Sequence, residues 1–264
     1  RYPGILEDSV VGVEAKKLFG DAQRMLDEII ASKSLQANGV IGFYEANASE
    51  DDVILYNGEE NQELATLHFL RQQNKKAQNL PNFCLADFIA PVGTKKDYVG
   101  MFAVTAGIGL ENLVARYKKD QDDYSEIMAK ALADRLAEAF AELLHERVRK
   151  EFWGYACNEK LNEEDLIKEK YQGIRPAPGY PACPEHTEKA TLFNLLGAEQ
   201  VGIQLTESYA MYPAAAVSGY YFSHPQSKYF GLGKINKDQV VDYAKRKKMT
   251  LAETEKWLSP NLAY

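Results

Sequence analysis

Residues 173–189 read Gly-Ile-Arg-Pro-Ala-Pro-Gly-Tyr-Pro-Ala-Cys-Pro-Glu-His-Thr-Glu-Lys, and four prolines and two glycines fall within the first twelve positions. Proline fixes the backbone φ angle and has no amide hydrogen to donate, so this segment is predicted to be a stiff loop outside any sheet interior. Gly179 allows the backbone to approach a ligand, or to turn, where a Cβ atom would clash. Regular structure is therefore expected only on either side of this loop.

Two side chains of the loop suit a ligand that joins an amino acid to a nucleoside. Arg175 offers a planar guanidinium that can pair with a carboxylate through two hydrogen bonds. Tyr180 adds an aromatic ring, and the proline-rich backbone leaves carbonyl oxygens free to accept. The residues alone fit a second interpretation equally well, in which the loop covers the core and Arg175 forms a structural salt bridge.

Upstream of the loop the patterns alternate between helix and strand. Apolar residues at three- and four-residue steps predict a helix over residues 13–30. Short apolar runs bounded by polar turns predict strands over residues 39–44, 53–56, 83–89 and 98–105.

The longest predicted helix covers residues 123–150. Asp123, with Glu126 three residues later, fits a capping box at its start. One side is expected to pack on the sheet and carries apolar residues: Ile127, Ala131, Leu132, Leu136, Ala139, Leu143 and Val148. The opposite side is expected to face solvent and carries polar residues: Asp134, Glu138, Glu142 and His145.

Downstream of the loop the patterns predict one further helix and a run of strands. The helix covers residues 187–196, the strands cover residues 206–211, 217–222 and 229–235, and two short helices close the chain. Helices cluster in the middle of the chain while strands occur in runs toward both ends. This order favours an α+β fold with a mainly antiparallel sheet and flanking helices in a single domain, residues 1–264.

Composition narrows the function. The chain has 38 acidic and 31 basic residues and a net charge of −7, which argues against a nucleic-acid-binding protein. No apolar run approaches the roughly 20 residues that span a bilayer, so no membrane partner is expected. Three widely spaced cysteines indicate a reducing cytoplasm. Because Arg1 is not an initiator methionine, we expect a fragment of a longer protein.

The loop also resembles a known family. Arg-Pro-Ala-Pro-Gly-Tyr-Pro-Ala-Cys-Pro-Glu-His-Thr-Glu-Lys, starting at Arg175, is similar to the S-adenosylmethionine loop of the activation domain of cobalamin-dependent methionine synthases. Further stretches resemble the same family in order along nearly the whole chain: Leu85-Ala-Asp-Phe-Ile-Ala-Pro, His145-Glu-Arg-Val-Arg, Val217-Ser-Gly-Tyr-Tyr-Phe-Ser-His-Pro and Trp257-Leu-Ser-Pro-Asn-Leu. The resemblance implies a curved domain built on a twisted antiparallel sheet, the C-terminal module of a larger enzyme.

The resemblance also implies a binding site for S-adenosylmethionine. Arg175 matches the arginine that binds the carboxylate, and the backbone near Ala177 and Gly179 meets the adenosyl part with Tyr180 beside it. The family has two adjacent aromatic residues, usually both tyrosine, which are Tyr229 and Phe230 here, so one hydroxyl is missing. The family also has an aspartate that contacts the ligand in a segment upstream of the position of Arg1. This chain begins after that segment, so we expect it to bind the ligand more weakly than the intact domain does.

The function that the resemblance implies is reductive methylation of inactive cobalamin, with S-adenosylmethionine as methyl donor. Cobalamin is expected on another module of the same polypeptide, which would dock near Asp134 and Glu138. A flavodoxin or a flavoprotein reductase is the expected electron donor. Because the sulfonium is already a strong electrophile, no catalytic acid or base is predicted. Cys183 and His186 offer too few ligands for a metal site.

The basic run at residues 245–248, Lys-Arg-Lys-Lys, fits either a solvated helix end or a docking site for the acidic electron donor. Two other functions stay open. A free-standing methyltransferase would show alternating strands and helices with a glycine-rich first turn, and that pattern is not visible. A non-catalytic module that only docks a flavodoxin-type reductase would have no affinity for S-adenosylmethionine.

Overall fold

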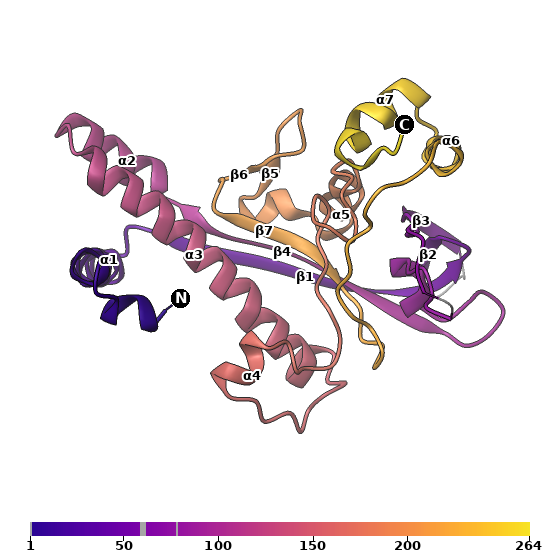
Figure 1. Ribbon diagram of the computed structural model, residues 1–264, viewed down its shortest axis with the longest axis horizontal. Coiled ribbons are helices and arrows are strands. Elements are labelled where there is room, and N and C mark those ends of the chain that lie inside the picture. The colour runs from indigo at the N-terminus through magenta and orange to yellow at the C-terminus, as the bar shows by residue number, and fades with distance from the viewer. Residues whose placement is uncertain (1, 59–61, 78) are drawn as a thin grey trace.

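The computed structural model describes residues 2–58, 62–77 and 79–264. Its centre is a sheet in which every neighbouring pair is antiparallel, with strand order β3-β2-β1-β4-β7. The strands are β1 (Gln36–Ser49), β2 (Asp52–Asn57), β3 (Gln62–His68), β4 (Asp97–Ile108) and β7 (Ala216–Tyr221). The two longest, β1 and β4, run side by side along the molecule (Figure 1). The prediction of an α+β fold with a mainly antiparallel sheet is therefore confirmed.

Helices cover both faces of this sheet. Helix α3 (Asp123–Arg147) crosses one face in contact with β4 and β7, and α5 (Glu188–Leu196) packs on the other (Figure 1). Adjacent residues of β7 show the two sides, because Tyr220 belongs to the core under α5 and Tyr221 to the core under α3. The remaining helices are α1 (Gly12–Ser32), α2 (Leu110–Lys119), α4 (Glu163–Ile167), α6 (Lys237–Arg246) and α7 (Leu251–Leu258). A small second sheet pairs β5 (Gln204–Leu205) with β6 (Met211–Tyr212).

The side of α3 that faces the sheet differs from the predicted side. Its buried residues include alanines four positions apart, none of them exposed: Ala129, Ala133, Ala137 and Ala141. Small side chains let the helix lie close to the strands, while the larger Ile127 and Leu143 of the predicted stripe stay 67% and 54% exposed. The predicted capping box is also wrong, since Asp122 caps the helix by accepting from the Ser125 amide.

Several short strands were predicted where the backbone takes another form. Residues 83–89 contain the 3-10 helix Leu85–Phe88, and residues 206–210 form the turn between β5 and β6. Residues 229–235 form no strand. Gly233 has a φ of +75°, the carbonyl of Gly231 accepts from the Gln72 side chain, and Ile235 makes an isolated bridge to Leu262. The predicted helices at 13–30 and 187–196, the strands at 39–44, 53–56, 98–105 and 217–222, and two C-terminal helices are confirmed.

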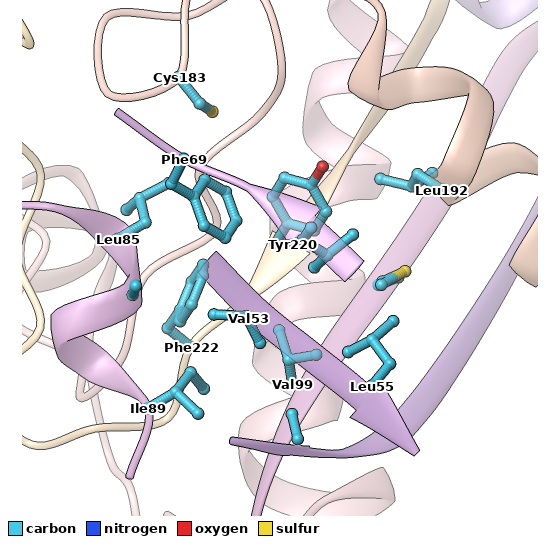
Figure 2. Close-up of a cluster of buried hydrophobic side chains, with 14 of the residues drawn as sticks. Val53, Leu55, Phe69, Leu85, Ile89, Val99, Cys183, Leu192, Tyr220 and Phe222 are labelled. Atoms are coloured by element: carbon cyan, nitrogen blue, oxygen red, sulfur yellow. The ribbon is translucent and has the colours of Figure 1, made fainter. Parts of the chain in front are cut away.

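The core on the α5 side ties the proline-rich loop to the sheet. Figure 2 shows Cys183 of that loop near Phe69, above Tyr220 of β7 and Phe222, the residue that follows this strand. Cys183 is 8% exposed and Tyr220 is completely buried. Burial of this end of the loop fixes its position relative to β7.

Candidate functional site

The loop of residues 173–184 lies along the free edge of β7, outside the sheet interior as its prolines predict. The amide of Ile174 donates to the carbonyl of Phe222, and the Phe222 amide donates back to the carbonyl of Ile174, both at 3.0 Å. Further along, the Tyr220 amide donates to the carbonyl of Pro176 at 2.8 Å. At this point the loop accepts from the strand and donates nothing, so proline costs no hydrogen bond.

Beyond Pro176 the chain folds back on itself in a closed turn. The Tyr180 amide donates to the carbonyl of Ala177, which also accepts from the Cys183 thiol, both at 3.0 Å. The Gly179 amide donates to the carbonyl of Cys183 at 2.8 Å. Gly179 has a φ of +96°, and a Cβ atom there would collide with the ring of His186. Only glycine satisfies both conditions, which explains this residue without any ligand.

A pocket of about 490 Å³ opens between this turn, α3 and the segment that carries Tyr229. Five of the six residues predicted to bind the ligand line it: Arg175, Ala177, Tyr180, Tyr229 and Phe230. Gly179 does not line the pocket and contributes through the turn. Glu138 and Glu169 also border it. The structure thus brings together residues from three distant parts of the chain.

Arg175 lines this pocket and forms a structural salt bridge, one of the two interpretations that the sequence left open. Its Nη2 donates to Glu142 on α3 at 2.5 Å, and its backbone amide donates to the Tyr229 hydroxyl at 3.0 Å. Its Nε is buried and has no hydrogen-bond partner among the described residues. Burial opposes the positive charge, but Glu142 outweighs it and raises the pKa of Arg175, so the guanidinium stays cationic.

Behind Arg175 lies a buried layer of aromatic and charged side chains. His145 stacks on Tyr221 with ring centroids 5.2 Å apart and meets the edge of Tyr171 at 5.0 Å. Arg149 is completely buried, pairs with Glu159 at 2.8 Å and lies over the Tyr171 ring. Burial, together with the charges of Arg149 and Arg175, holds the pKa of His145 well below its ordinary value.

This layer corrects the expectation that Glu142 and His145 belong to a solvated stripe of α3. His145 has no exposed surface, and the Glu142 side chain is 30% exposed. Sequence analysis missed Glu142 as the partner of Arg175 because the two lie 33 residues apart. The available signal was the alanine repeat, whose four-residue step continues to His145 and whose last member, Ala141, precedes Glu142.

The two acidic residues predicted to dock a partner lie on α3 beside the pocket. Glu138 lines the pocket, and Asp134 is exposed and pairs with the neighbouring Arg135 at 2.5 Å. Among the described residues Glu138 makes no ion pair or hydrogen bond. This part of α3 therefore presents negative charge next to the pocket.

The basic run at residues 245–248 does not form a continuous basic surface, because two of its four cations pair with carboxylates of the fold. Arg246 pairs with Asp52 and with Asp242. Lys247 points inward and its side chain is only 9% exposed. Lys245 and Lys248 alone stay exposed, because the other two neutralise carboxylates of the fold.

Two general findings concern the described residues. No three His, Cys, Asp or Glu side chains of residues 2–58, 62–77 and 79–264 gather as metal ligands would. No helix in the same ranges is long and apolar enough to cross a membrane. The three cysteines are free, with Cys84 and Cys183 buried and Cys157 exposed.

Comparison with known proteins identifies the family. Residues 1–248 match the family model described as "Vitamin B12 dependent methionine synthase, activation domain". A solved structure described as "Crystal Structure of the MetH Reactivation Domain bound to AdoHcy" is 57% identical, with a TM-score of 0.96, and the match covers 100% of this chain and 82% of that one. The resemblance seen in the loop is thereby confirmed over the whole length. The chain belongs to the activation-domain family of vitamin B12-dependent methionine synthases.

Proposed function

We propose that this chain binds S-adenosylmethionine in the pocket above Arg175 and presents its methyl group for the reductive methylation of inactive cobalamin. The observation that carries the proposal is a cationic guanidinium in the wall of a pocket that aromatic side chains and loop residues also line. The similar MetH structure is described as bound to AdoHcy, which is the product left when S-adenosylmethionine loses its methyl group. A domain of the same family with the same fold supports the same ligand class.

The pocket fits the chemistry of this ligand. Its volume of about 490 Å³ lies within the range of small-molecule sites. Arg175 would pair with the carboxylate, since its Nε has no partner among the described residues. Tyr180 and Phe230 offer flat faces for the adenine ring, and the backbone near Ala177 offers polar contacts. Phe230 has no hydroxyl, so any polar contact on that side must come from backbone or from Tyr229.

The carboxylates of Glu138 and Glu169 at the pocket wall complement the positive sulfonium and ammonium groups of the ligand. Reduced cobalamin, when carried by its own module, supplies the nucleophilic cobalt for the methyl transfer. This chain then needs to place the sulfonium and hold it, and it needs no acid or base. The closed turn of residues 177–183 and the Arg175–Glu142 pair supply that rigidity.

We also propose which partners meet this pocket. The acidic part of α3 at Asp134 and Glu138 borders the mouth of the pocket, which suits the cobalamin module of the same polypeptide. We propose a flavodoxin or flavoprotein reductase as electron donor and homocysteine as the substrate of the whole enzyme. Free cysteines favour the cytoplasm as its location.

Calorimetric titration with S-adenosylmethionine tests the proposal. Arg175→Ala should weaken binding by about 1.5–3 kcal/mol, or roughly ten- to a hundredfold. Arg175→Lys keeps the charge but loses the planar guanidinium. Its affinity should lie between those of the wild type and Arg175→Ala. Arg116→Ala removes an exposed arginine on α2 and should bind as the wild type does. A folded wild-type protein that does not bind the ligand would overturn the proposal and favour the docking-only module.

A further inference from the structure

A buried ion cluster lies beneath the ligand loop, and its cation comes from the C-terminal part of the chain. Lys247 follows α6, and its Nζ lies 2.7 Å from Glu185 Oε2 and 2.8 Å from Glu188 Oε1. The same ammonium donates to the Thr187 hydroxyl at 2.5 Å. Glu185 is 2% exposed and Glu188 is 4% exposed. Lys247 is thus the cation that compensates two buried carboxylates.

Glu185 connects this cluster to the loop. It follows Pro184 directly and accepts from the Thr187 amide and hydroxyl, both at 2.6 Å, where α5 begins. The Tyr243 hydroxyl on α6 also donates to it, at 3.2 Å. The Glu185 carboxylate therefore fixes the backbone at the point where the loop becomes helix.

His186, the residue after Glu185, connects this cluster to the turn that lines the pocket. The His186 ring packs against Gly179 of the closed turn, and Lys189 donates to its Nδ1 at 2.9 Å. On the opposite side the Leu232 amide donates to the carbonyl of Pro181 at 2.7 Å. The turn that lines the pocket is therefore held between His186 and residues 229–233. A shift of Glu185 would move His186 and release one of these two supports.

Removing the positive charge of Lys247 is expected to disturb the buried carboxylates strongly. Burial opposes the charge of Lys247, but Glu188 and Glu185 outweigh it and raise the pKa of Lys247, so it stays protonated. Removal of one partner from a buried pair leaves an uncompensated charge, which a protein relieves by rearranging or by taking up water or a proton. For Glu185 such a rearrangement would reach the loop, because Pro184 of the loop directly precedes this residue.

We propose that Lys247 is a positioning residue for S-adenosylmethionine: by holding Glu185 it keeps the closed turn of residues 177–183 in the shape that binds the ligand. Lys247 does not line the ligand pocket. The proposal rests on the proposed function of the pocket. A residue at the end of α6 would thus help to shape the ligand pocket. This role accounts for the inward position of Lys247, whereas Lys245 and Lys248 face solvent.

Titration of three variants with S-adenosylmethionine tests this role, at a temperature where melting curves show each protein to be fully folded. Lys247→Met keeps the length of the side chain without its charge and should weaken binding about tenfold, or about 1.4 kcal/mol. Lys247→Arg should restore most of the affinity. Lys245→Met removes an exposed lysine of α6, two residues before Lys247, and should bind like the wild type. A purely structural lysine would lower the melting temperature of Lys247→Met and leave its affinity unchanged.

A second pair of variants keeps the test decisive if Lys247→Met does not fold. Glu185 and Glu188 are similarly buried and both pair with Lys247, but only Glu185 adjoins the loop. Glu185→Gln should weaken binding several-fold, and Glu188→Gln should stay within about twofold of the wild type. Equal affinities for the two variants, or unchanged affinity in folded Lys247→Met, would overturn the inference. A wild-type protein without affinity would instead overturn the proposed function.

Discussion

The guanidinium of Arg175 and the carboxylate of Glu142 form an ion pair at 2.5 Å that joins the proline-rich loop to helix α3. The two side chains are 20% and 30% exposed, so the pair is only partly screened by water. One oxygen of Glu142 and the Nε of Arg175 are buried without partners among the described residues. The pair is therefore a structural contact that leaves one buried donor and one buried acceptor without partners among the described residues.

A double-mutant cycle should reveal this coupling. We expect Glu142→Gln and Arg175→Ala each to lower the free energy of unfolding, because each leaves the other charge without its partner. The double variant should lose less than the sum, by a coupling energy of about 1–3 kcal/mol. Urea denaturation of the four proteins measures it, and additive losses would show that the two residues act independently.

His145 should make stability depend on pH. Its folded pKa lies well below the ordinary 6.5, so below about pH 6.5 the unfolded chain binds a proton that the folded chain does not. Stability should therefore fall as the pH drops through this window, by at most about 1.4 kcal/mol per pH unit for this group. His145→Phe keeps a ring against Tyr221 and should flatten the profile measured by urea denaturation between pH 7.5 and 5.

His186 adds a smaller slope of the same sign, because burial and the nearby Lys189 also lower its pKa. The His145→Phe profile should consequently be flatter without becoming level. His224→Gln, which removes a histidine outside the layer behind Arg175, is the matched control for the loss of an imidazole. If the stability of His145→Phe fell as steeply as that of the wild type when the pH is lowered, His145 would not be the buried neutral histidine described above.

The alanine side of α3 predicts opposite outcomes for two neighbouring alanines. Ala137 is completely buried against the sheet, and Ala139 two residues later is exposed. Ala137→Leu should cost about 1–3 kcal/mol, because the added methyl groups force the helix away from β4 and β7. Ala139→Leu should change stability by less than about 0.5 kcal/mol. If the two substitutions changed the melting temperature equally, the alanine side of α3 would not be the side that packs on the sheet.

Gly179 should be intolerant of alanine for two separate reasons. Its φ of +96° disfavours any Cβ, and the ring of His186 occupies the space that a Cβ would need. Gly93 has a comparable φ of +81° but open space around it, so Gly93→Ala reports the backbone cost alone, about 1–2 kcal/mol. Gly179→Ala should lose clearly more stability than Gly93→Ala and should also weaken ligand binding. Identical melting temperatures would mean that the ring contact is unimportant.

The sequence determined those features that depend on the chain's own local pattern. Apolar spacing located α1, α3 and α5, and short apolar runs bounded by polar turns located β1, β2, β4 and β7, because both signals lie within the residues of the element itself. The prolines of residues 173–184 identified the loop, since they restrict the backbone whatever lies nearby. The matching stretches identified the family, and five of the six predicted ligand residues line one pocket.

Only the tertiary structure decided which polar groups face inward. Glu142, His145 and Lys247 all belong to patterns typical of solvated surfaces, yet each is buried or half-buried against partners far along the chain. A charged side chain enters the interior only where folding brings it a partner, and no local period encodes a partner 33 or 62 residues away. The buried side of α3 was likewise set by the sheet beneath it, which accepts alanine and excludes larger residues.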